Sequence, residues 1–197
     1  MRRLVFFITI LMFIAFAVPL PSVAAEKPIV IGAPLATAFL YGWDAERGIK
    51  LAVEEINKAG GVNVKGKKRP FAVEVIDTRD LEPGVPVSEA LLGLEKLILE
   101  KKADFIIGGP VRSEAALAAM DLLNKYKKIS ILTTGVLTPA YQKKIADNYD
   151  KYKYCFRNTS HVGVMMNEFI TMLEDLRKSH GFDKAAVRRC AERVVLQ

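Results

Sequence analysis

The stretch Asp104–Met120, DFIIGGPVRSEAALAAM, decides the fold. Residues 105–107 form an apolar run that is too short for a helix and is followed by glycine and proline, so they predict a buried strand. Ser113 then begins a helix with one apolar face, and its hydroxyl is expected to cap the first free amides. A strand that turns tightly into a helix presents unpaired N–H groups and the positive end of the helix dipole. In open α/β sheets this edge binds ligands.

The same strand-then-helix pattern recurs on both sides of this stretch. Strands are expected at residues 28–33, 71–76, 105–107, 129–132 and 154–157, with helices starting at Asp44, Val87, Ser113, Thr138 and Val162. The polar segment 62–69 between the first helix and the second strand is expected to be an exposed turn. This alternation predicts an α/β fold with a doubly wound, flavodoxin-like parallel sheet in the order 2-1-3-4-5. The loops after strands 1, 3 and 4 then face one cleft.

The first 25 residues are expected to be a signal peptide. Arg2 and Arg3 precede an apolar run that ends near two prolines, and the small residues of 23–25 follow. This order is typical of a secretory leader cleaved after Ala25, and it predicts a periplasmic or extracytoplasmic location. An uncleaved membrane anchor is the alternative. The formal charge of +7 is spread along the chain, which disfavours nucleic acid as a partner.

The cleft loops supply the candidate binding residues. Tyr41 follows the first strand and offers an aromatic wall with a hydroxyl, although packing within its own lobe is the alternative. Arg112 and Ser113 stand at a helix start and offer anion-binding groups, although arginine is also common at exposed helix ends. Gly135 and Val136 follow the fourth strand and offer backbone amides.

Signatures of catalysis are missing from the sequence. No dinucleotide-binding glycine pattern, phosphate-binding loop or nucleophile elbow is present. His161 and His180 are not spaced as ligands on one helix face, and surface or cap positions are expected for both. Turn chemistry explains Asp77 and Asp80. The sequence therefore predicts a protein that is not an enzyme and that uses no cofactor or metal.

Five blocks of the sequence resemble one known family. They read IVIGAPLATAFLYGWDAERGIKLAVEEINKAGG, VEVIDTRD, FIIGGPVRSEA, ILTTGVLTPAY and YKYCFRNTS. In this order they resemble the extracytoplasmic solute-binding proteins of the branched-chain amino acid (Leu/Ile/Val-binding) ABC transporter family, which are type I periplasmic binding proteins. The resemblance covers about Pro28 to Phe182. It implies two α/β lobes around a hinge, a small solute held in the cleft, and membrane permease subunits as partners.

The resemblance also assigns roles to individual residues. Tyr41 matches a tyrosine of the family's ligand pocket, and Arg112 or Ser113 falls where a serine hydroxyl holds the ligand carboxylate. Gly135 and Val136 occupy backbone-contact positions. Leu137 stands where amino acid binders usually carry threonine. Arginine for serine and leucine for threonine leave the solute open between a branched-chain amino acid and another carboxylate, such as an aromatic or aliphatic acid.

The resemblance divides the chain into three parts: signal peptide 1–25, N-terminal ligand-binding lobe 26–157, and hinge with a truncated start of the second lobe 158–197. The final dozen or so residues depart from the family pattern, which suggests a truncated or frame-shifted product. The helix at Val162 then either folds back on the first lobe or exposes its apolar face, and ligand affinity is expected to be poor. Alternatives are the ligand-sensing domain of a receptor or regulator and, less favoured, an exported enzyme on a flavodoxin-like fold.

Overall fold

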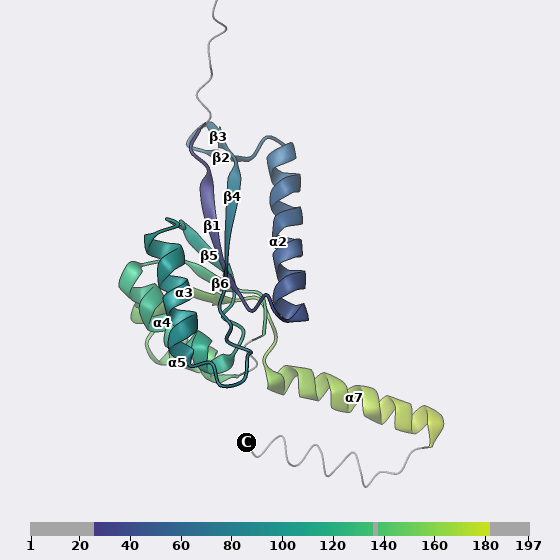
Figure 1. Ribbon diagram of the computed structural model, residues 1–197. Helices are drawn as coiled ribbons and strands as arrows, with labels where there is room; N and C mark the ends of the chain where they lie inside the picture. Colours follow the sequence, from purple (N-terminus) through teal and green to yellow (C-terminus); the bar gives the residue numbers. More distant parts are fainter. Residues whose placement is uncertain (1–25, 136–137, 182–197) are drawn as a thin grey trace, which may run out of the picture.

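A five-stranded parallel sheet forms the centre of the molecule (Figure 1). The computed structural model describes residues 26–135 and 138–181. The sheet strands are β1 (Ile29–Leu35), β4 (Phe71–Asp77), β5 (Phe105–Gly108), β6 (Ser130–Leu132) and β7 (Cys155–Arg157). Their spatial order is β4-β1-β5-β6-β7, and every neighbouring pair is parallel. Counted along the chain this is the order 2-1-3-4-5, so the predicted doubly wound α/β topology is confirmed.

Helices cover both faces of the sheet (Figure 1). They are α2 (Leu40–Lys58), α3 (Val87–Leu99), α4 (Ser113–Tyr126), α5 (Ala140–Asp147), α6 (Tyr149–Tyr152) and α7 (Val162–His180). α2 lies on one face, whereas α3, α4 and α5 lie on the other. α7 matches its predicted bounds and ends at Gly181, whose left-handed φ of 73° fits a glycine C-cap. It extends away from both layers of the lobe.

The core lies between the sheet and α3 with α4. Alternate strand residues point to this side, so Ile106 of β5 and Leu132 of β6 are buried. They contact one buried cluster, which also contains Leu94, Leu97, Ala116, Ala119, Met120 and Leu123. α2 differs, because Gly42 is its only buried residue. The two faces of the sheet are therefore unequally covered, and the β5–α4 unit supplies much of the better-packed face.

The predicted start of α2 is wrong. The helix begins at Leu40, four residues before Asp44, so Tyr41 and Trp43 lie in its first turn and not in a loop. Leu40 and Tyr41 are 67% and 70% exposed. The helical spacing of apolar residues reports a face buried in the core, and this first turn has no such face. Its residues therefore gave no helix signal.

The segment 62–69 is a β-hairpin and not simply a turn. β2 (Val62–Val64) and β3 (Lys67–Arg69) pair antiparallel. The two residues between them, Lys65 and Gly66, have positive φ of 53° and 85°, as the favoured two-residue hairpin turn requires. The Asn63 side chain also accepts a hydrogen bond from the Gly66 amide at 2.8 Å. β3 consists of charged residues alone, Lys67, Lys68 and Arg69, which hid the hairpin in the sequence.

Two predicted helix starts also need correction. Ser113 is the first residue of α4 and not its cap, because Arg112 occupies the N-cap position and provides no side-chain hydrogen bond there. Pro139, rather than Thr138, is the N-cap residue of α5, although the Thr138 hydroxyl accepts a hydrogen bond from the Ala140 amide at 3.1 Å.

Candidate functional site

A close backbone contact fixes the start of α2 beside the carboxyl edge of the sheet. A Cβ added to Gly42 would lie 2.1 Å from the carbonyl oxygen of Ala36, in the segment that follows β1. Only glycine fits at this distance, because a side-chain carbon would overlap the carbonyl. The Phe39 amide also donates to the same Ala36 oxygen at 3.1 Å. The first turn of α2 is thus seated on β1, and the Tyr41 side chain extends from it into solvent.

Arg112 joins two loops at the same edge. Its backbone amide donates to a carboxylate oxygen of the buried Asp80 at 2.6 Å. Both terminal nitrogens of its guanidinium donate to the carbonyl oxygen of Val85, each at 3.2 Å. Its Nε atom lies 3.9 Å from the Glu114 carboxylate. The guanidinium therefore uses part of its donor capacity to hold the loop after β4.

Gly135 brings the loops after β5 and β6 into contact. Its φ is +54°, in the left-handed region that glycine adopts at low cost. An added Cβ would lie 2.5 Å from a side-chain carbon of Val111 and 2.6 Å from the Val111 carbonyl oxygen. A larger residue at position 135 would therefore push the two loops apart.

These residues line one pocket of about 350 Å³. Its lining consists of Tyr41, Leu81, Val111, Arg112, Ser113, Glu114 and Gly135. The fold thus brings four sequence-predicted residues together, from the starts of α2 and α4 and from the loop after β6. Val136 and Leu137, the other two candidates, lie outside the described residues. Sequence reasoning missed Leu81, Val111 and Glu114, although Val111 and Glu114 adjoin predicted positions.

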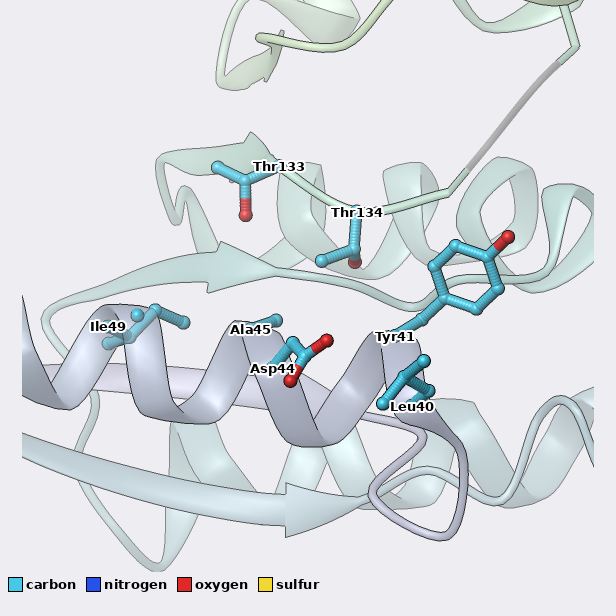
Figure 2. A pocket seen from close by; sticks show the side chains of 8 residues that line it. Leu40, Tyr41, Asp44, Ala45, Ile49, Thr133 and Thr134 are labelled. Atoms are coloured by element: carbon cyan, nitrogen blue, oxygen red, sulfur yellow. The ribbon is translucent and has the colours of Figure 1, made fainter.

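A larger pocket of about 590 Å³ also includes Tyr41 in its lining (Figure 2). Its walls are one side of α2 and the segment after β6, through Leu40, Tyr41, Asp44, Ala45, Gly48, Ile49, Thr133 and Thr134. Within the described residues, the Asp44 carboxylate has no hydrogen-bond or ion-pair partner. Size alone favours this pocket as the ligand site. The smaller pocket is the stronger candidate by chemistry, because its polar groups converge at a helix N-terminus.

The smaller pocket can hold an anion. α4 has no side-chain cap, so the backbone amides of Ser113 and Glu114 lack an acceptor among the described residues. Such amides, at the positive end of the helix dipole, are a favourable place for a carboxylate. Arg112 adds a full positive charge beside them, whereas Glu114 opposes it from the rim. Tyr41 supplies an exposed aromatic face for the apolar part of a ligand.

Neither a metal site nor a membrane span occurs among residues 26–135 and 138–181. No three His, Cys, Asp or Glu side chains come together there as metal ligands would. None of the helices in these ranges has the length and apolar character needed to cross a bilayer. The predicted signal peptide lies outside them.

Comparison with known proteins agrees with this architecture. The family model described as "Periplasmic binding protein" matches residues 34–187, which is most of the chain. A protein of Silicibacter pomeroyi described as a branched-chain amino acid ABC transporter superposes with a TM-score of 0.65 at 22% identity. That alignment covers 81% of this chain and 38% of the other. At this identity it supports the fold alone.

Two further structures were solved with ligands. The branched-chain amino acid transporter substrate-binding protein LivJ of Streptococcus pneumoniae, in complex with isoleucine, has 25% identity and a TM-score of 0.54. The alignment covers 68% of this chain and 34% of LivJ. A solute-binding protein of an ABC transporter of Rhodopseudomonas palustris HaA2, in complex with p-hydroxybenzoic acid, has 16% identity and a TM-score of 0.54. The alignment covers 78% of this chain and 37% of the Rhodopseudomonas palustris protein.

The chain therefore spans well under half the length of the solved proteins that it matches. The matched family and its solved neighbours are substrate-binding proteins and not enzymes. The doubly wound sheet agrees with the match over residues 34–187, which is more than half of the chain. On these grounds the chain belongs to the periplasmic binding protein family.

Proposed function

We propose that this protein is the extracytoplasmic substrate-binding component of an ABC importer and that it binds a small carboxylate-bearing solute. One observation carries the proposal: Tyr41, Arg112, Ser113 and Gly135 line a single pocket at an uncapped helix N-terminus. The carboxylate lies against the amides of Ser113 and Glu114 beside Arg112. The remainder of the solute lies along Tyr41.

The solute class follows from the same groups. Isoleucine and p-hydroxybenzoic acid, bound by the two ligand-containing neighbours, share a carboxylate and an apolar body. Both features fit a pocket that combines an anion-binding helix end with an aromatic ring. The proposal therefore covers branched-chain amino acids and related organic acids, and delivery of the solute to the membrane subunits of an ABC permease.

We also propose the location and division of the chain. Residues 1–25 act as a signal peptide, 26–157 form the N-terminal ligand-binding lobe, and 158–197 contain the hinge and the start of a second lobe. N-terminal sequencing of exported material checks the first boundary: a mature start at Glu26 supports it, whereas a chain that retains Met1 contradicts it.

A solution NMR titration tests ligand binding. Isoleucine and p-hydroxybenzoate are each added to the chain beside their amide counterparts, which lack the carboxylate. We expect at least one carboxylate to shift the amide signals of Ser113, Glu114 and Gly135, with the matching amide about tenfold weaker because it loses a charge-assisted contact. The single tryptophan, Trp43, lies two residues from Tyr41 and gives a second assigned signal.

Two variants and one control complete the experiment. Tyr41→Ala should weaken binding about tenfold without lowering the unfolding free energy, because this ring is 70% exposed. Arg112→Gln should weaken the binding of the carboxylate ligands more than the binding of their amide counterparts. The control is Arg69→Gln, whose guanidinium also donates to backbone carbonyls but at the start of β1. Two outcomes would contradict the proposal. One is equal affinity for the carboxylate ligands and their amide counterparts, and the other is no shift of the backbone amide signals of Ser113, Glu114 and Gly135.

A further inference from the structure

Arg157 lies at the end of β7 and contacts two separate segments. One terminal nitrogen donates to the Thr138 carbonyl oxygen at 2.8 Å and to the Gln142 side-chain oxygen at 2.6 Å. The other donates to the Ser160 carbonyl oxygen at 3.4 Å. Thr138 belongs to the connection from β6 into α5, and Gln142 lies in the first turn of α5. Ser160 belongs to the connection from β7 into α7. A single guanidinium therefore joins the two connections.

Two further hydrogen bonds join the same parts of the chain. The Thr159 hydroxyl donates to the carbonyl oxygen of Gly135 at 3.4 Å, and Gly135 lines the proposed solute pocket. The Asn158 amide donates to the Leu132 carbonyl oxygen at 2.9 Å. Asn158 and Thr159 are thus attached directly to the end of β6 and to the segment that follows it, and Ser160 is attached through Arg157. This attachment gives the solute pocket a direct physical path to the start of α7.

α7 depends on this path for its direction. Its N-cap is His161, whose Nδ1 accepts a hydrogen bond from the Gly163 amide at 3.1 Å, as expected for a histidine at a cap position. No residue of α7 is buried. With so little packing against the lobe, the helix takes its orientation from the four residues that connect it to β7. Whatever holds residues 158–161 therefore sets where α7 points.

The chemistry of the contact suits this role. Burial lowers the pKa of Arg157 from its ordinary value, although the guanidinium remains charged at neutral pH. Charge-assisted hydrogen bonds are roughly twice as strong as neutral ones, and a planar fork can hold several acceptors at once. Lysine at this position would carry the charge but could not span the same acceptors. The arrangement of acceptors therefore requires the planar, several-donor guanidinium of arginine.

We infer that Arg157 is a positioning residue that couples the segment after β6, where the solute pocket lies, to the direction of α7. Its contacts with Thr138 and Gln142 make the position of the guanidinium depend on that segment. Its contact with Ser160 makes the connection into α7 depend, in turn, on the guanidinium. Signalling of a bound solute through this link rests on the proposed function. The mechanical coupling itself does not, and it is tested without a solute.

The test is a double-mutant cycle read by amide hydrogen exchange. Gln142→Ala removes one acceptor of Arg157 on the β6 side. We expect it to raise exchange at Asn158, Gly163 and Val164 about tenfold, because a lost charge-assisted bond favours local opening by that order. In an Arg157→Gln background the same Gln142→Ala change should have no further effect. Non-additivity of this kind identifies a shared link.

Three comparisons separate coupling from general loosening. The Ile106 amide, which donates to Ile129 within the sheet, should exchange at the wild-type rate in every variant. Compared with Arg157→Gln, Arg157→Lys should regain the wild-type unfolding free energy, whereas the amides of Gly163 and Val164 should still exchange faster than in the wild type. Arg69→Gln should change none of these amides. Two results would overturn the inference. One is that the effects of Gln142→Ala and Arg157→Gln on exchange add, and the other is that Arg157→Lys returns exchange at Asn158, Gly163 and Val164 to the wild-type rates.

The same exchange measurements with a carboxylate ligand added then test whether the coupling serves the proposed function. A bound carboxylate should slow exchange at Asn158 and Gly163 in the wild type and leave both unchanged in Arg157→Gln. If no solute binds the wild type, the proposed function fails while the exchange cycle still decides the coupling. If a solute binds and protects α7 equally in both proteins, the coupling is wrong although the proposed function stands.

Discussion

A carboxylate oxygen of Asp80 accepts a hydrogen bond from the backbone amide of Arg112 at 2.6 Å. This bond ties the loop after β4 to the residue that precedes α4. The other oxygen of Asp80 accepts from the hydroxyl of Thr78, and both Asp80 and Thr78 are buried. A charged side chain thus organises the floor of the proposed solute pocket without facing the solute.

Replacing Asp80 by alanine should lower the unfolding free energy by about 2–3 kcal/mol, because the Arg112 amide and the Thr78 hydroxyl lose a buried charged partner. Urea unfolding of wild type and variant measures the loss. Asp77→Ala is the matched control, since Asp77 also accepts backbone hydrogen bonds but is exposed, so water can replace it. Equal losses at the two positions would show that the burial of Asp80 does not matter.

Two glycines of α2 should respond in opposite ways to alanine. Gly42→Ala forces a Cβ to within 2.1 Å of the Ala36 carbonyl oxygen, so the first turn must shift and stability should fall by about 2 kcal/mol or more. Gly48 meets nothing within 4 Å, so Gly48→Ala should raise stability by about 0.5–1 kcal/mol through better helix propensity. Thermal unfolding of the two variants checks both signs. A stable Gly42→Ala protein with an unmoved Tyr41 would refute the seating contact.

Acid stability should depend in part on Asp121. Its hydrogen bond from Lys151, with further contacts from Lys144 and Tyr152, lowers its pKa to about 2. Because the folded pKa lies below the unfolded value of about 4, the group stabilises the fold above pH 4 and loses this contribution as pH falls towards 2. The carboxylate is 51% exposed, so screening limits the effect to a few tenths of a kcal/mol, at most about 1.

Urea unfolding between pH 5 and pH 2 measures this dependence. Asp121→Asn should be less stable than the wild type at pH 5, and the difference should vanish near pH 2. Asp147→Asn removes another surface carboxylate, which pairs with Lys143, and serves as the control. A constant difference between Asp121→Asn and wild type across this range would rule out the assigned titration.

The apolar face of α7 should promote association of this chain. Phe169 and Met172 are 45% and 49% exposed, and Val162, Val164, Met165 and Leu176 are exposed beside them. We expect concentration-dependent association in sedimentation velocity and binding of an apolar dye. Met172→Lys should reduce both, whereas Thr171→Lys adds the same charge at the neighbouring position and should reduce them less. A wild-type chain that is monomeric at all concentrations and binds no dye would contradict this expectation.

The sequence predicted the sheet well because its signals there are local. The β5–α4 unit has a short apolar run, a glycine-proline break and a helix with one apolar face, and each of these follows from neighbouring residues. The order 2-1-3-4-5 then follows from alternation and right-handed crossovers. The bounds of α7 were also predicted, because its apolar spacing and Gly181 mark them clearly.

The site was harder to predict because it depends on contacts between distant residues. Tyr41 was assigned to a loop, since the first turn of α2 is seated by Gly42 on Ala36 and shows no buried face. The direction of the Arg112 side chain follows from the Val85 carbonyl, 27 residues earlier in the chain. No local pattern reports such a partner. The residue types at the pocket were therefore predictable, whereas their orientations were not.

The contact between Gly42 and Ala36 separates two tasks that often fall on the same residues. The helix is located by a residue with no side chain, so the neighbours that face the pockets, Leu40, Tyr41 and Asp44, take no part in locating it. Of these three, only Tyr41 lines the proposed solute pocket, so variation at position 41 can change that pocket without moving the helix. We expect substitutions of Tyr41, with Gly42 retained, to be a direct way to redirect solute preference.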